Sequence, residues 1–235
     1  MDFLISTFLC ILLINVINRF TNKEKRLTGK PMAHLFLLGA LAAIIIIAFT
    51  VADRDWDRAI LTGVFGLSDT DIFFALTDAF ILTALMEEAL KYIILKTYLK
   101  THDCAEYPYQ TVVAAVAVGA GFAAAENIVY MFGDAGLLTR IIFGIFGHFV
   151  YAVYMGINMA KAGQSSDPFE KGKFYLRALI IPWLLHGTFD FAIALLQMDI
   201  ENPFLYLFII LVLFIIFIVF YVIGAFKRVR AASRE

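Results

Sequence analysis

The sequence has little charge and few cysteines. Charged residues make up 17% of its 235 residues, whereas a soluble domain of this length carries about 25%. The two cysteines, Cys10 in a hydrophobic run and Cys104 in a loop, lie too far apart in depth to pair and indicate no disulfide framework. A formal net charge of −1 without any long basic block argues against nucleic acid as a partner. These absences exclude the usual soluble, disulfide-stabilised and nucleic-acid-binding classes.

Hydrophobic residues dominate instead, at 62% of the chain with 24 Phe and a mean hydropathy of +0.84. A membrane-spanning helix needs roughly 20 apolar residues. Runs of about that length occupy 3–20, 32–52, 70–98, 109–132, 137–160, 174–197 and 203–226. The sequence therefore predicts an all-α, polytopic helical bundle of about seven transmembrane helices. We expect one integral membrane domain over 1–235, because no internal repeat, low-complexity stretch or soluble domain is visible.

Basic residues in the connecting loops predict the orientation of these helices, since cytoplasmic loops are enriched in Lys and Arg. Alternate loops carry 4, 2, 3 and 4 basic residues, 13 in all, whereas the loops between them carry 2, 1 and 0, 3 in all. The alternation predicts an N-terminus outside and a C-terminus inside. The basic residues follow the first run rather than precede it, so we expect an uncleaved helix and not a signal peptide.

One segment, 59–69, is apolar but too short to span a bilayer. We expect it to be interfacial or re-entrant and to lead into the third helix. Ser68 or Asp69 is the expected N-cap of that helix, because both side chains can accept from the first backbone N–H groups.

The third run carries three charges in its middle, Glu87, Glu88 and Lys91. Each charge at the centre of a spanning helix costs about 2.5–3.5 kcal/mol on insertion scales. At about 100° per residue, the three side chains fall within about 100° of one another on a single sector. That sector cannot face lipid. It is expected to face a protein-lined polar cavity.

Polar residues return in the next three runs. The fourth run has Phe122 and Glu126 on one face, followed by Asn127, and its Gly/Ala composition permits close helix packing. Glu126 lies nearer the outer face than Glu87, so the two meet only if this helix is tilted or broken. The fifth run has His148, and the sixth has His186 and Asp190 one turn apart, a spacing that lets the carboxylate orient the ring.

Carboxylates and imidazoles together are the groups needed to activate water. A buried Glu can act as general base, a His can share its proton or stabilise an oxyanion, and Asn127 is a candidate neutral donor. The same groups are also a plausible ligand set for a divalent metal such as zinc, with Glu88, Glu126, His148 and His186 as candidate ligands, although no His-Glu-x-x-His motif is present. A proton- or ion-coupled transporter and a non-catalytic membrane scaffold are the alternatives. The absence of an inverted repeat argues against the transporter.

The order of these motifs resembles that of the PrsW family of intramembrane proteases, which is distantly similar to the CAAX prenyl endopeptidases. The resemblance rests on Glu87-Glu88-x-x-Lys91, Phe122-x-x-x-Glu126-Asn127, His148 and His186-x-x-x-Asp190, and covers roughly residues 70–195, the expected catalytic core helices. It implies that Glu87 and Glu88 are the catalytic pair. Glu126, His148, His186 and Asp190 would complete the site, with Lys91, Asn127 and Phe122 supporting it.

The resemblance also implies a biological setting. PrsW-like proteases are implicated in site-1 cleavage of membrane-bound anti-sigma factors. The expected partners are a single-pass membrane protein substrate and the lipid bilayer, and the expected location is a bacterial or archaeal plasma membrane. The family has been described both as glutamic-type and as metalloprotease-like, so the resemblance leaves the metal open.

Overall fold

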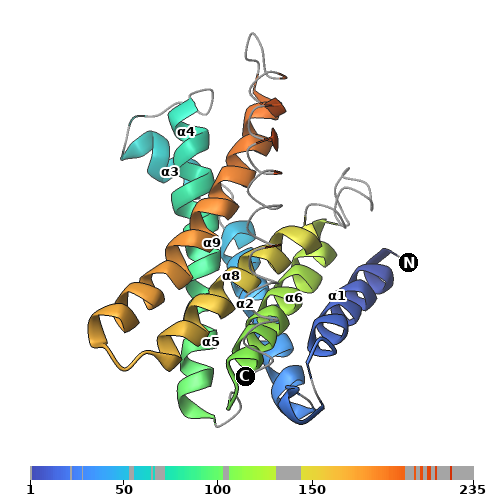
Figure 1. The fold of residues 1–235 in the computed structure, drawn as a ribbon. Helices are drawn as coiled ribbons and strands as arrows, with labels where there is room; N and C mark the ends of the chain where they lie inside the picture. Colours follow the sequence, from blue (N-terminus) through green and yellow to red (C-terminus); the bar gives the residue numbers. More distant parts are fainter. Residues whose placement is uncertain are drawn as a thin grey trace.

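Helices account for all regular structure among the residues that the computed structural model describes, and no strand occurs there (Figure 1). The described residues are 2–21, 23–27, 29–52, 56–64, 66, 72–102, 106–130 and 144–198, with isolated positions at 204, 207, 208, 211, 212, 215 and 223. The predicted all-α class is confirmed. Most of the seventh hydrophobic run, the first part of the fifth, and the expected N-cap at Ser68 or Asp69 lie outside the described residues.

Over the described residues, the first six predicted runs correspond to helices with small shifts at their ends. The bundle consists of α1 (Asp2–Asn18), α2 (Lys30–Ala52), α6 (Pro108–Tyr130), α8 (Phe146–Gln164), α9 (Pro168–Gln197) and one continuous helix made of α4 (Ile72–Thr77), η2 (Asp78–Leu85) and α5 (Met86–Thr101). A short 3₁₀ turn, η1 (Lys23–Lys25), precedes α2. The short α3 (Trp56–Gly63) overlaps the segment that we expected to be interfacial or re-entrant.

Three of these helices, α2, α6 and α9, are long and apolar enough to cross a membrane by length and composition. The connections α1–α2, α5–α6 and α8–α9 lie at the same end of the bundle (Figure 1). Most of the basic residues counted above lie in these connections or in the helix ends beside them. This arrangement agrees with the alternation of charge in the sequence. The orientation relative to a membrane stays a prediction.

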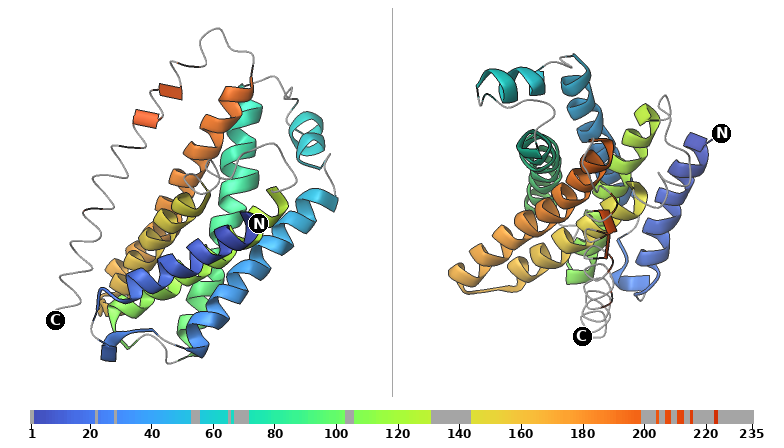
Figure 2. Two further views of the ribbon diagram at one scale, coloured as in Figure 1. Left: turned by 90° about the vertical axis from the view of Figure 1, so that its right-hand side faces the viewer. Right: turned by 90° about the horizontal axis from the view of Figure 1, so that it is seen from above.

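Helix α6 forms the centre of the bundle, with α2 and α8 packed against it and α1 lying along the periphery (Figure 2). Small residues make the close packing possible, as the Gly/Ala pattern predicts. A Cβ atom on Gly121 would lie 1.9 Å from the carbonyl oxygen of Phe36 in α2. A Cβ atom on Gly119 would lie 3.0 Å from the carbonyl oxygen of His148 in α8. The glycines of α6 therefore hold the His148 backbone close to the bundle centre.

The third helix contains a π-helical stretch, η2, directly before the charged turn of α5. Wider turns of this kind are rare in proteins, and many of those that do occur are found at functional sites. Here the stretch packs against α9. The carbonyl oxygen of Phe80 accepts a hydrogen bond from the Trp183 indole at 2.6 Å, and the Phe80 ring covers Gly187. Trp183 and Gly187 flank His186 in the sequence, so these two contacts fix the position of His186 along the axis of α9.

Replacing Gly187 by Ala is expected to lower the melting temperature, because the new Cβ atom would lie 2.4 Å from the Phe80 ring. Overpacking of this kind costs about 1–3 kcal/mol. The matched control is Gly172→Ala in the same helix, where an added Cβ meets nothing within 4 Å. Thermal unfolding of the purified protein in detergent measures both variants, and equal melting temperatures would contradict the proposed role of this contact.

Candidate active site

Three charged side chains of α5 are buried on the same face of the helix, as the spacing predicts. Glu88 is 0% exposed, Lys91 3% and Glu87 6%. The Lys91 ammonium lies 2.8 Å from Glu88 Oε1 and 3.3 Å from Glu87 Oε2. It also lies 3.8 Å from the centroid of the Phe122 ring in α6, in a cation–π contact. Lys91 therefore neutralises part of the negative charge of both glutamates inside the bundle.

His148 of α8 connects Lys91 to Glu126. The Lys91 ammonium lies 3.0 Å from His148 Nδ1, and since a protonated lysine can only donate, this nitrogen accepts. The proton of a neutral His148 ring then lies on Nε2, which is 2.5 Å from Glu126 Oε2. Glu126 thus joins the cluster through His148. Figure 1 shows α6 running beside α8, the helix that carries His148.

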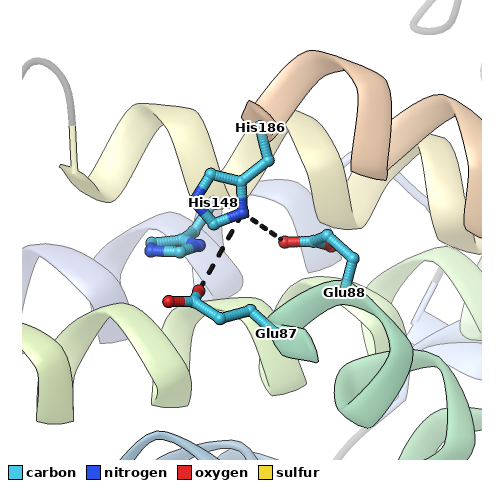
Figure 3. Close-up of side chains that lie close together, drawn as sticks. All are labelled: Glu87, Glu88, His148 and His186. Carbon is cyan, nitrogen blue, oxygen red and sulfur yellow. Dashed lines mark hydrogen bonds and ion pairs between the residues drawn. The ribbon is translucent and has the colours of Figure 1, made fainter. Parts of the chain in front are cut away.

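His186 of α9 lies among three carboxylates. Its Nδ1 atom is 3.0 Å from Glu88 Oε1 and 3.9 Å from Glu87 Oε2 (Figure 3). Its Nε2 atom is 3.3 Å from Asp190 Oδ2, one turn further along α9. The ring therefore presents Nδ1 to Glu88 and Nε2 to Asp190. This geometry suits the exchange of a proton between Glu88 and His186, with Asp190 orienting the ring.

The six residues predicted to form the site are thus brought together by four helices: Glu87, Glu88, Glu126, His148, His186 and Asp190. Burial within the cluster is uneven. The side chains of Asp190 and Glu126 are 25% and 17% exposed, whereas those of the other four are at most 8% exposed. Asp190 and Glu126 are therefore the most exposed members of the cluster.

Asn127 lies apart from this cluster, although it follows Glu126 directly. Its amide donates to the Ser6 hydroxyl of α1 at 2.8 Å. The contact joins α6 to α1 instead of supplying a donor to the acids and histidines. One side chain that sequence reasoning did not single out belongs to the cluster. The buried Tyr151 ring stacks on the His186 ring, with centroids 4.8 Å apart and planes 21° apart. The only sequence signal for it was its position three residues after His148.

The donor set fits a divalent metal by its chemistry. Glu87, Glu88, His148 and His186 each offer one ligand atom, and these atoms lie within 4.8 Å of one another. Two imidazoles and two carboxylates suit zinc, and the buried Glu88 Oε2 has no hydrogen-bond partner among the described residues. Glu87 belongs to this group in place of Glu126, which instead contacts the outer nitrogen of His148. Lys91 contacts three of these four residues, so an ion held by the same atoms would have to displace the ammonium.

The apolar bundle and its buried acids and histidines define a polytopic membrane protein with a polar cluster inside it. Residues 30–222 match the family model described as PrsW family intramembrane metalloprotease. The chain therefore belongs to the PrsW family of intramembrane proteases, as the motif order predicts.

Curated relatives named Protease PrsW give the same result. The protein from Clostridioides difficile is 28% identical over 195 residues, which cover 78% of this chain and 77% of the relative. The protein from Shouchella clausii is 28% identical over 163 residues, covering 68% of each chain. The Bacillus subtilis protein is 31% identical over 121 residues, and there the match spans only about half of the relative, 55%. No solved structure matches the chain significantly.

Proposed function

We propose that this chain is an intramembrane endopeptidase in which Glu88 activates a water molecule. One observation carries the proposal. Glu88 is a fully buried carboxylate whose Oε1 atom is bound by Lys91 and His186, while its Oε2 atom has no hydrogen-bond partner among the described residues. A buried oxygen of this kind is rare, because most such atoms are paired with protein or water. Glu88 Oε2 is therefore the atom that would accept a proton from water.

In the proposed mechanism, water donates one proton to Glu88 Oε2, and the hydroxide oxygen forms a bond to the carbonyl carbon of a peptide. The C–N bond then breaks, and the same proton passes to the leaving amine, so that Glu88 returns to its ionised state. His186 is hydrogen-bonded to Glu88 Oε1 and assists this transfer, while Asp190 orients its ring. Lys91 keeps at least one of the two glutamates ionised through its direct contacts.

A metal is the alternative source of activation at the same site. Zinc held by Glu87, Glu88, His148 and His186 would supply a Lewis acid that polarises the peptide carbonyl. Glu126 would then orient His148 from its other ring nitrogen, in the way that carboxylates support metal-bound histidines.

The proposed substrate is a membrane-anchored protein with a single spanning or juxtamembrane segment. An intact helix engages its peptide groups in internal hydrogen bonds, so the segment must unwind locally before cleavage. The PrsW resemblance extends this proposal to membrane-bound anti-sigma factors. The curated relatives are bacterial, which supports a multi-pass location in a bacterial plasma membrane.

The test is cleavage of single-pass substrates by the purified protein in liposomes. Cleavage by wild type that persists in the presence of a chelator is the expected result, because Lys91 already contacts three of the four candidate ligand residues. Loss of cleavage with chelator and its return with added zinc would assign the site to a metal instead. A pH-sensitive dye inside the same liposomes measures proton flux. Flux without cleavage of any substrate by the folded protein would favour a transporter and contradict the proposal.

A further inference from the structure

The N–H donors of the cluster already have partners. The three protons of the Lys91 ammonium face Glu87, Glu88 and His148. The Nε2–H group of His148 faces Glu126, as the tautomer argument requires. His186 Nδ1 is hydrogen-bonded to Glu88 Oε1, and its Nε2 atom lies 3.3 Å from Asp190 Oδ2, an ion-pair contact in which Oδ2 has no hydrogen-bond partner among the described residues. An oxyanion at this site would therefore need a donor other than Lys91, His148 or His186, unless an existing contact breaks.

The Tyr151 hydroxyl is a donor without such a partner. Tyr151 is 2% exposed, and its Oη atom is buried with no hydrogen-bond partner among the described residues. Its ring is fixed from two sides, stacked on His186 and edge-on to His148 with centroids 5.9 Å apart. The hydroxyl lies over Gly147, where an added Cβ atom would be 3.3 Å from Oη. The ring is thus held rigidly while its hydroxyl proton remains available.

A buried and unpaired hydroxyl has an energetic cost. Leaving a donor unsatisfied in this way costs about 1–3 kcal/mol, and unpaired polar atoms in folded proteins are few. Phenylalanine would give the same ring contacts with His186 and His148 without that cost. The hydroxyl therefore points to a partner that binds during the reaction. Glu88 and Tyr151 both contact His186, Glu88 through Oε1 and Tyr151 through its ring, so an opening that admits a peptide to Glu88 would lie next to Tyr151.

We infer that Tyr151 is a catalytic residue of the proposed protease, whose hydroxyl donates a hydrogen bond to the carbonyl oxygen of the cleaved peptide. This inference rests on the proposed function. When the hydroxide oxygen adds to the carbonyl carbon, the carbonyl π electrons move to oxygen, which becomes an oxyanion. The Tyr151 O–H group stabilises that charge without transferring its proton, and the interaction strengthens as the charge develops.

The test is Tyr151→Phe in the liposome cleavage assay. Removal of one oxyanion donor lowers kcat by roughly 10²–10³-fold, and that is the expected loss, with KM changed by less than about threefold. The matched control is Tyr154→Phe, which removes a hydroxyl from a tyrosine that is equally buried in the same helix. The melting temperature of each variant separates an effect on catalysis from an effect on folding. Equal losses of kcat in the two variants would overturn the inference.

A second variant leaves the hydroxyl in place and displaces it. Gly147→Ala adds a Cβ atom close to Oη, so a smaller fall in kcat than that of Tyr151→Phe is expected. If Tyr151→Phe does not fold, Gly147→Ala tests whether the Tyr151 hydroxyl contributes to catalysis. A wild-type kcat in folded Gly147→Ala would then overturn the role. If the wild-type protein cleaves no substrate, the proposed function is overturned and the role of Tyr151 with it. If wild type and Tyr151→Phe both cleave with the same kcat, only the role of Tyr151 is overturned.

Discussion

Replacing Glu88 by Gln is expected to lower the cleavage rate by roughly 10²–10⁴-fold, the usual contribution of general acid–base catalysis. Glutamine has nearly the same shape, so it can keep an oxygen toward Lys91 and His186 while losing the ability to take a proton from water. Because packing is preserved, the effect should fall on kcat and not on folding. Single-turnover cleavage in liposomes measures the rate, and thermal unfolding in detergent verifies the fold.

Glu87→Gln is the comparison that tests the choice of base. Glu87 contacts Lys91 at 3.3 Å and lies 3.9 Å from His186 Nδ1, a longer distance than that of Glu88. Its contribution is therefore mainly to the electrostatics of the site, and a smaller loss of rate is expected than for Glu88→Gln. A larger loss in Glu87→Gln would assign the base to Glu87. Full cleavage activity in Glu88→Gln would contradict general-base catalysis by Glu88.

Replacing Lys91 by Met is expected to destabilise the protein by about 3–5 kcal/mol, the usual effect of removing one partner of a buried ion pair. Methionine is apolar, so it loses the cation–π contact with Phe122 and leaves Glu87 and Glu88 without their shared cation. Two buried carboxylates then repel each other in a medium that solvates neither. The melting temperature in detergent is the measurement, and a large decrease is expected.

Lys96→Met is the matched control for Lys91, because Lys96 lies on the same helix and is exposed. Its ammonium contacts the Tyr92 hydroxyl at 3.1 Å and the Tyr175 ring at 4.4 Å, so its loss should cost little. Adding Glu87→Gln to Lys91→Met removes one of the uncompensated charges and should restore part of the stability. Equal melting temperatures for Lys91→Met and Lys96→Met would show that Lys91 is not the counterion of the acid pair.

Much of the fold could be predicted because it depends on properties that are local in sequence. The lengths of the hydrophobic runs predicted the third helix to within a few residues. That run covers 70–98, and the observed helix covers 72–101. Helical spacing placed Glu87, Glu88 and Lys91 on one face, and the cost of exposing charge to lipid required that face to be buried. These arguments need no knowledge of which helices are neighbours.

Contacts between helices could not be predicted in the same way, because they depend on tilt, rotation and side-chain rotamers. The sequence could not show that Asn127 reaches Ser6 while the adjacent Glu126 reaches His148. Tyr151 was not singled out because an aromatic residue in an apolar helix usually packs in the core. The features that suggest a function for Tyr151 are its unpaired hydroxyl and the packing of its ring against two histidine rings, and both are visible only in the structure.

The π-helical stretch η2 has a consequence for how this chain can change in length. A π-turn holds an extra residue relative to an α-turn, so it absorbs an insertion within a helix. Side chains before Asp78 are rotated about the helix axis relative to the α-helical register of Glu87 and Glu88. Gain or loss of a residue here would turn α4 relative to α5 and leave the spacing of the acids intact. The π-helical stretch would therefore tolerate a change in length on its N-terminal side without changing the spacing of Glu87 and Glu88.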